Sequence, residues 1–194
     1  METMQALFMK NFESHRQAFA SLVELSTAVS NAADLMIGAL RHGGRLFFCG
    51  NGGSAADAQH LAAEFTGRFK FDREPLDAYA LHVNTSAITA VGNDYGFEQI
   101  FAREIRAHGR AGDVLVGLST SGRSQNVVLA MKAARELGIK NIAFTGIEGR
   151  DMETLADVLL NVPSTETPRI QEMHIFLGHT LCEIVEGTLY SPKC

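Results

Sequence analysis

Apolar residues recur at helical spacing over the first 42 positions and again near the carboxyl end. In an amphipathic helix, apolar side chains three and four residues apart share one face. The pattern predicts two helices within residues 3–42, ending at His42-Gly43-Gly44, and one long helix over about residues 169–189 with Pro168 in its first turn. The positions that carry it are Leu7, Phe8, Phe12, Phe19, Leu22, Val23, Ala32, Leu35, Met36, Ala39 and Leu40, then Ile170, Met173, Phe176, Leu177, Leu181, Ile184 and Val185.

Between these regions, short apolar runs alternate with turns and further helical patterns. Such alternation is typical of βαβ units, in which helices cover both faces of a parallel sheet. We therefore expect an α/β fold, a three-layer sandwich around five parallel strands, with additional N-terminal helices. The 194 residues suit a single domain, with helices in 1–42 and the sheet-and-helix core in 43–194. The expected strands are Leu46–Cys49, Ala78–Val83, Val114–Leu118, Asn141–Thr145 and Val158–Val162.

Charge and composition narrow the possible partners. The formal net charge is -5, and clustered Lys and Arg are lacking, which argues against nucleic-acid binding. Residues 70–77, with Pro75 and several charges, are expected to form a surface loop. The apolar surface of the N-terminal and last helices exceeds what one core needs, so we expect these helices to pack against another copy of the chain.

The cysteines and the first residues bear on the compartment. Cys49, Cys182 and Cys194 stand at unrelated spacings, which predicts neither a disulfide framework nor a zinc knuckle. The first 17 residues have no basic region followed by a continuous apolar core, so they do not resemble a signal peptide. No apolar stretch approaches the roughly 20 residues of a membrane span. We expect a cytoplasmic protein that does not associate with membranes.

Two turns that follow expected strands have the composition of phosphate sites. Ligands of open parallel sheets bind beyond the carboxyl ends of the strands, where helix N-termini present free N–H groups. The first turn, residues 50–55, contains three glycines and Ser54, which can cap the following helix. The second turn, residues 119–124, places four hydroxyls around one glycine.

Each turn could also be only a connection between a strand and a helix. Gly50, Gly52 and Ala55 match a relaxed dinucleotide fingerprint, but that site needs an acidic residue at the end of the second strand. The chain has His82-Val83-Asn84 there, which disfavours a dehydrogenase. The absence of Gly-Lys-Ser/Thr excludes a P-loop.

The residues most suited to chemistry lie on two expected helices. His60 and Glu64 stand four residues apart, on one face of a helix rich in alanine. This spacing suits a shared metal or an acid/base pair, and the alternative is an exposed ion pair. His179 lies in an apolar stretch of the last helix, where it is either functional or a core histidine bonded to backbone. Gln171 precedes His179 by about 12 Å of helix rise, which points to a site between subunits.

These residues also carry a resemblance to a known family. The chain resembles the sugar isomerase (SIS) family, and within it the members that isomerise heptose phosphates, from Gly50 onward. The N-terminal helices are similar only in type. The matching segments are GNGGSAADAQHLAAEFTGRF, VGNDYGF, GDVLVGLSTSGRSQNV and TPRIQEMHIFLGH.

The resemblance implies a flavodoxin-like sheet, a homotetramer with active sites between subunits, and conversion of D-sedoheptulose 7-phosphate into D-glycero-D-manno-heptose 7-phosphate. This reaction is the first step toward the ADP- or GDP-heptose precursors of bacterial surface polysaccharide. Glu64 and His179 match the acid/base pair of the family. The positions that match substrate contacts are Asn51, Gly52, Gly53, Ser54, Arg68, Asn93, Asp94, Ser119, Thr120, Ser121, Ser124 and Gln171.

The family also suggests a metal. Some members with the Thr-Pro sequence found here at Thr167-Pro168 are similar in binding one zinc ion per subunit, through positions that match His60, Glu64, Gln171 and His179. Other members have an acidic residue at the position of Pro168, so any role of that carboxylate does not transfer to this chain.

The implied chemistry fits the residue types, because moving a carbonyl from C2 to C1 through a cis-enediol needs a base for a carbon-bound proton. Two other functions stay open. A related group of SIS proteins binds the bacterial replication initiator without catalysis, but its members lack the acid and the imidazole. The phosphate turn does not report chain length, so another phosphosugar could be the substrate.

Overall fold

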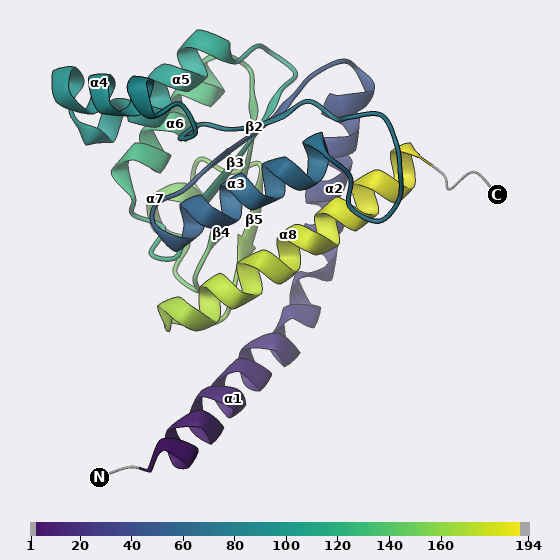
Figure 1. Ribbon diagram of the computed structural model, residues 1–194, viewed down its shortest axis with the longest axis vertical. Helices are drawn as coiled ribbons and strands as arrows, with labels where there is room; N and C mark the ends of the chain where they lie inside the picture. Colours follow the sequence, from purple (N-terminus) through teal and green to yellow (C-terminus); the bar gives the residue numbers. More distant parts are fainter. Residues whose placement is uncertain (1–2, 191–194) are drawn as a thin grey trace.

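The computed structural model describes residues 3–190, which form five parallel strands and the helices around them (Figure 1). The strands are β1 (Leu46–Cys49), β2 (Ala78–Ala80), β3 (Val114–Ser119), β4 (Lys140–Thr145) and β5 (Val158–Asn161). The helices are α1 (Met4–Ser21), η1 (Leu22–Leu25), α2 (Ser26–Arg41), α3 (Gly53–Thr66), α4 (Thr85–Tyr95), η2 (Phe97–Gln99), α5 (Ile100–His108), α6 (Gln125–Glu136), α7 (Arg150–Glu153) and α8 (Thr167–Leu189).

The strand order is β2-β1-β3-β4-β5, so the direction of winding reverses between β1 and β3. All four pairings are parallel, with Phe48 opposite Val116 and Val116 opposite Ile142. In such sheets ligands bind where neighbouring strands lead into loops on opposite sides. The turns after β1 and β3, which the sequence singles out for phosphate, both begin at this point.

The sheet separates two apolar cores. On one face, residues of α2, α3 and α8 pack against alternate strand residues such as Phe48 and Phe144. On the other face, α5, α6 and α7 pack against the intervening ones such as Phe47 and Leu115. The three-layer sandwich is therefore confirmed. Helix α1 extends away from the layers (Figure 1), and Ala18 is its buried residue.

The elements differ from expectation in several details. The edge strand β2 ends at Ala80 rather than Val83, because its residues pair only with β1 and the chain turns at Leu81 and His82. The strand β5 ends at Asn161, and α8 begins at Thr167, two residues earlier than the periodicity suggests. Ser54 does not cap α3. Gly52 is the cap residue, and Ser54 is buried inside the first turn.

Helix α8 is anchored to the sheet by His174. This imidazole is fully buried, packs edge-on against Phe144, and has its Nε2 3.1 Å from the carbonyl oxygen of Thr145. Burial lowers the pKa of His174 to about 4, so the ring is neutral at pH 7 and can donate to that carbonyl. His174 therefore helps to fix how α8 is rotated against the sheet.

The cysteines and helices also answer two smaller expectations. Cys49 and Cys182 are buried thiols, and burial raises the pKa of both, so they are packed as small apolar side chains. Cys194 lies outside the described residues. Within residues 3–190, none of the helices combines the length and apolarity that crossing a membrane requires.

Candidate active site

Helices α3 and α8 run side by side and in the same direction, and glycines set how closely they approach. A Cβ atom added to Gly178 would lie 2.6 Å from both Cδ atoms of Leu61. At the start of α3, a Cβ atom on Gly53 would lie 2.5 Å from Nε2 of Gln171. Two glycines, one on each helix, therefore permit this contact, and the same contact fixes which residues of the two helices face each other.

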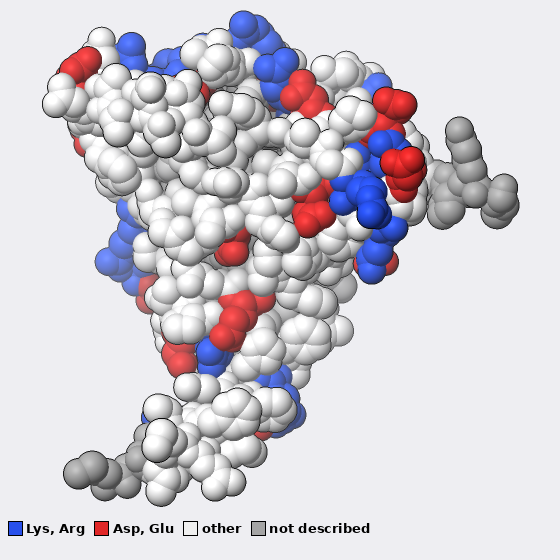
Figure 2. Space-filling view, in the orientation of Figure 1, with Lys and Arg blue, Asp and Glu red and all other residues white. Residues whose placement is uncertain are grey.

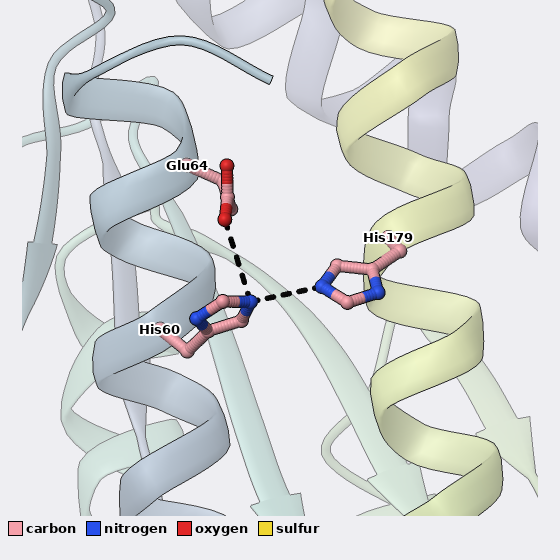
Figure 3. Close-up of side chains that lie close together, drawn as sticks. All are labelled: His60, Glu64 and His179. Carbon is pink, nitrogen blue, oxygen red and sulfur yellow. Dashed lines mark hydrogen bonds and ion pairs between the residues drawn. The ribbon is translucent and has the colours of Figure 1, made fainter. Parts of the chain in front are cut away.

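This register brings three candidate side chains together (Figure 3). His60 Nε2 lies 2.9 Å from His179 Nε2 and 3.4 Å from Glu64 Oε1. One ligand atom from each of the three residues falls within 4.8 Å of the others. His60 is half exposed and Glu64 is 23% exposed. His60 and Glu64 do meet as the i, i+4 spacing predicts, and the arrival of His179 makes the pair a three-residue cluster open to solvent.

The cluster has the donors of a zinc site. Zinc accepts imidazole nitrogen and carboxylate oxygen at about 2.0–2.2 Å, so its ligand atoms lie a little over 3 Å apart. At 2.9 Å the two imidazole nitrogens cannot both carry a proton, and two bare lone pairs would also repel each other, so either one proton is shared between them or a cation lies there. The three side chains thus fit a divalent ion with little rearrangement.

His179 sits in surroundings that favour its neutral form. Burial and the neighbouring His60 lower its pKa, while Glu64 acts in the opposite direction. The Phe69 ring lies 5.5 Å from the imidazole, centroid to centroid, and covers one side of it. At neutral pH the ring is therefore available as a metal ligand or as a proton acceptor.

Phe69 and the end of α3 are held by a buried ion pair that the sequence did not indicate. Arg73 and Glu186 are each 1% exposed, and Arg73 Nε donates to Glu186 Oε1 at 2.8 Å. The same carboxylate accepts the N–H of Phe69 at 2.8 Å, while Arg73 donates to the carbonyl oxygen of Glu64 at 3.0 Å. The segment 70–77 is the expected surface loop, with most of its residues exposed, and the N–H of Lys70 and the Arg73 side chain fasten it to α8.

The second turn, residues 119–124, is preorganised. Ser119 Oγ lies 2.8 Å from Ser124 Oγ and 3.5 Å from Ser121 Oγ. Gly122 has φ +64°, and a Cβ atom there would lie 2.4 Å from the carbonyl oxygen of Gly149, so the turn requires glycine. The Ser124 hydroxyl is directed toward Ser119 instead of capping α6, which leaves the positive end of that helix to an anion.

The two phosphate-type turns are tied together by a pair of amides. Asn51 Nδ2 donates to Asn126 Oδ1 at 2.9 Å, and Asn126 Nδ2 donates to Asn51 Oδ1 at 2.8 Å. Sequence reasoning missed Asn126, whose only signal was a polar residue in the first turn of the helix after β3. This bridge fixes the first turn relative to the second.

Four other candidate residues lie outside the His60–Glu64–His179 cluster. Gln171 contacts Gly53, two helical turns from His60. Asn93 and Asp94 are exposed on α4, where Asn93 Nδ2 donates to Asp94 Oδ1 at 2.8 Å, and α4 packs mainly on α5 and η2. Arg68 is exposed just after α3. Their roles stay predictions.

Comparisons with known proteins agree with this fold. Residues 11–146 match the SIS domain. The chain belongs to the SIS domain family. The curated phosphoheptose isomerase of Rhodospirillum rubrum is 56% identical over 173 residues, 89% of this chain and 92% of that protein. The one of Aliarcobacter butzleri is 47% identical over 187 residues, 96% of this chain and 99% of that protein.

A solved structure shows the same likeness in three dimensions. The phosphoheptose isomerase of Neisseria gonorrhoeae superposes with a TM-score of 0.91 at 47% identity, covering 95% of this SIS chain and all of that one. The sugar isomerase domain of an RpiR transcription factor from Sphaerobacter thermophilus shares the fold at 18% identity, with a TM-score of 0.64 over 94% of this chain and 90% of that one. The agreement with phosphoheptose isomerases at about half identity, over nearly the whole of each chain, places this chain among the heptose-phosphate members of the family.

The close approach of α3 and α8 makes a prediction about stability. Gly178→Ala should lower the free energy of unfolding by about 1–3 kcal/mol, because the new methyl group collides with Leu61. Leu61→Ala alone should cost about 2–5 kcal/mol. In the double variant the added methyl occupies vacated space, so the combined cost should fall short of the sum by about 1 kcal/mol or more. Urea unfolding measures all three.

Gly187→Ala is the matched control on the same helix. Within residues 3–190 a Cβ atom at Gly187 meets nothing inside 4 Å, so this variant should gain about 0.5–1 kcal/mol from helix propensity. Additive costs for Gly178→Ala and Leu61→Ala would show that the two helices do not meet at this point.

Proposed function

We propose that this protein is an aldose–ketose isomerase that converts D-sedoheptulose 7-phosphate into D-glycero-D-manno-heptose 7-phosphate. The observation that carries the proposal is the convergence of Glu64, His60 and His179 from two helices in a chain that also carries a preorganised hydroxyl turn. The relatives at about half identity over nearly their whole length are phosphoheptose isomerases. The product would feed bacterial surface heptose synthesis in the cytoplasm.

In this proposal the sugar phosphate spans the two turns and the cluster. The phosphoryl group is bound by the hydroxyls of Ser119, Thr120, Ser121 and Ser124 and by the N-terminus of α6. The turn after β1, with Asn51, Gly52, Gly53 and Ser54, contacts the sugar chain, as does Gln171 beside Gly53. Arg68, Asn93 and Asp94 are exposed, and α4, which carries the last two, packs mainly on α5 and η2. These side chains would reach the substrate of a neighbouring subunit.

The chemistry assigned to the residues is a balanced proton transfer. The Glu64 carboxylate removes the proton from C1 of the open-chain ketose while a proton is delivered to the C2 carbonyl oxygen, which gives a cis-enediol. The C1 hydroxyl then loses its proton, and Glu64 returns the carbon-bound proton to C2, which gives the aldose. His179, a neutral member of the cluster, shuttles the protons between the sugar oxygens.

His60, Glu64 and His179 would hold a zinc ion, which when bound would supply Lewis-acid polarisation of the sugar oxygens. Gln171, the fourth ligand that the family suggests, would have to come from a neighbouring copy. Within one chain it is about 12 Å of helix rise from His179 and lies against Gly53. A carboxylate bound tightly to zinc is a poorer base, so the roles of Glu64 as base and as ligand compete.

Replacing Glu64 separates catalysis from binding. Glu64→Gln keeps the size of the side chain but removes the base, so kcat for sedoheptulose 7-phosphate should fall about 10²–10⁴-fold while binding of the sugar phosphate persists. Turnover assays and calorimetric titration measure the two effects. The control is Glu183→Gln, an exposed carboxylate on α8. Unchanged turnover in Glu64→Gln would remove this residue from the mechanism.

Zinc binding can be tested without any activity assay. Metal-stripped protein should take up one zinc ion per chain, measured by calorimetry and metal analysis. Removing a residue that only hydrogen-bonds to a metal ligand weakens metal affinity by ~10–100-fold. His60→Ala and His179→Ala each remove a ligand itself, so each should weaken zinc binding by more than that. His108→Ala, an exposed histidine on α5, should leave it unchanged. Zinc uptake that survives both cluster variants would contradict this assignment.

A homotetramer is supported by apolar side chains that one chain leaves uncovered. Phe8, Phe12 and Phe19 of α1 are 64%, 53% and 45% exposed, and Val23 is 74% exposed. An apolar groove of about 460 Å³ lies between this region and the exposed side of α8, which includes Phe176 and Ile184. In Figure 2 the part of the surface formed by α1 is largely uncharged, and elsewhere on this face both signs of charge are interspersed.

Sedimentation velocity on the full chain should therefore report a tetramer. Phe19→Glu, which places a charge in the apolar groove, should dissociate the assembly and reduce turnover together. Phe97→Glu, at a phenylalanine that is 61% exposed on η2, is the comparison variant. A monomer with full activity would contradict both the oligomer and its shared sites.

A further inference from the structure

A second cavity lies beside the phosphate turn, and its chemistry is that of an anion site. It has a volume of about 300 Å³ and is formed by the loops that follow β3, β4 and β5. Ligand pockets begin at about this size. Its walls include two guanidinium groups, from Arg123 and Arg150, and a set of hydroxyls. The hydroxyl residues that line it are Thr120, Ser121, Ser164, Thr165 and Thr167.

The cavity is separate from the site assigned to the substrate. Its lining contains Thr120 and Ser121, which form the wall common to both, while the other lining residues come from segments 146–150 and 164–170. Ser119, Ser124 and Asn51 do not line it, although Ser119 Oγ lies 3.5 Å from Ser121 Oγ. An occupant of the cavity would therefore contact the turn that holds the substrate phosphate from the side of the loops that follow β4 and β5.

The charges of the cavity favour an anion even though one carboxylate is present. Arg123 Nη2 lies 3.9 Å from Glu148 Oε2, and Arg150 is paired with the same oxygen. The two guanidinium groups share the single carboxylate of Glu148, so these three side chains of the cavity keep a net positive charge. Thr167 is the first residue of the 23-residue helix α8, whose positive end faces the same space. Among residues 3–190, Arg150 alone combines a side chain with a left-handed backbone, φ +50°.

We propose that this cavity is a second anion-binding site that takes a phosphate ester. Arginine binds phosphate through two parallel N–H groups, and serine and threonine hydroxyls can donate to its remaining oxygens. In the free protein Glu148 occupies the guanidinium groups, and an incoming phosphate displaces it. Because Thr120 and Ser121 border both sites, occupancy of the cavity changes the affinity of the turn for the substrate phosphate.

Calorimetric titration of the full chain with inorganic phosphate tests the proposal. The wild type should bind two phosphates per chain. Arg123→Gln with Arg150→Gln should weaken one of them roughly ten-fold or more and leave the KM for sedoheptulose 7-phosphate within about two-fold. Ser124→Ala should weaken the other and raise that KM. Arg106→Gln with Lys132→Gln, exposed cations on α5 and α6, controls for the loss of two charges.

Glu148→Gln gives an effect of opposite sign. Removing the competing carboxylate should tighten phosphate binding at the cavity, whereas Glu136→Gln, an exposed carboxylate on α6, should not. One phosphate per chain in the wild type would overturn the proposal. So would a rise in KM for the arginine double variant, which would make the cavity part of the substrate site. Two bound phosphates in a protein without turnover would support the cavity while contradicting the proposed reaction.

Discussion

The contact between Gly178 and Leu61 is the constraint on which the candidate active site depends. It lets α8 approach α3 more closely than any side chain at position 178 would allow, and His179 follows directly on the contacting residue. The packing of the two helix backbones therefore positions the His179 imidazole against His60. The 2.9 Å contact between their Nε2 atoms does not depend on a long, flexible side chain. Rigid helices hold catalytic groups more accurately than loops do.

Polar groups buried around this contact keep it in place. Arg73 and Glu186 bear a large desolvation cost, which is offset only because both have further partners. Burial alone would raise the pKa of Glu186. The N–H groups of Phe69 and Lys70 and the Arg73 guanidinium outweigh that effect, so the net pKa is lowered and the carboxylate stays charged. The same arginine binds the carbonyl oxygen of Glu64. The ion pair therefore ties the backbone at the proposed base to the helix that carries His179.

Much of this architecture could be predicted from the sequence, because periodicity reports local structure. The strands, the long last helix and the shared face of His60 and Glu64 follow from spacing within one element. Periodicity does not say which helix faces meet. The partnership of His60 with His179, the Asn51–Asn126 bridge and the Arg73–Glu186 pair join residues 75 to 119 positions apart, so only the folded chain reveals them.

Ser54 shows the other kind of error. A serine after three glycines has the composition of a helix cap, but the chain turns two residues earlier, at Gly52 with φ +55°, and the serine is buried within the helix. Because glycine can adopt positive φ, α3 begins after Gly52. The preference for serine at helix caps does not predict this start.

Electrostatics explains why the proposed base, Glu64, and the turns proposed to bind phosphate are far apart. The net charge of -5 is spread over the surface and is screened beyond about 8 Å at physiological ionic strength, so it opposes an anion less than nearby groups do. A carboxylate base close to a phosphate would repel it, and the raised pKa of that carboxyl group would leave less of it in the deprotonated form that accepts a proton. Helix α3 places Glu64 eleven residues from Gly53, about 16 Å of rise, which keeps the base away from the turns. A phosphorylated substrate suited to this arrangement carries its reacting carbons at the end opposite to its phosphate.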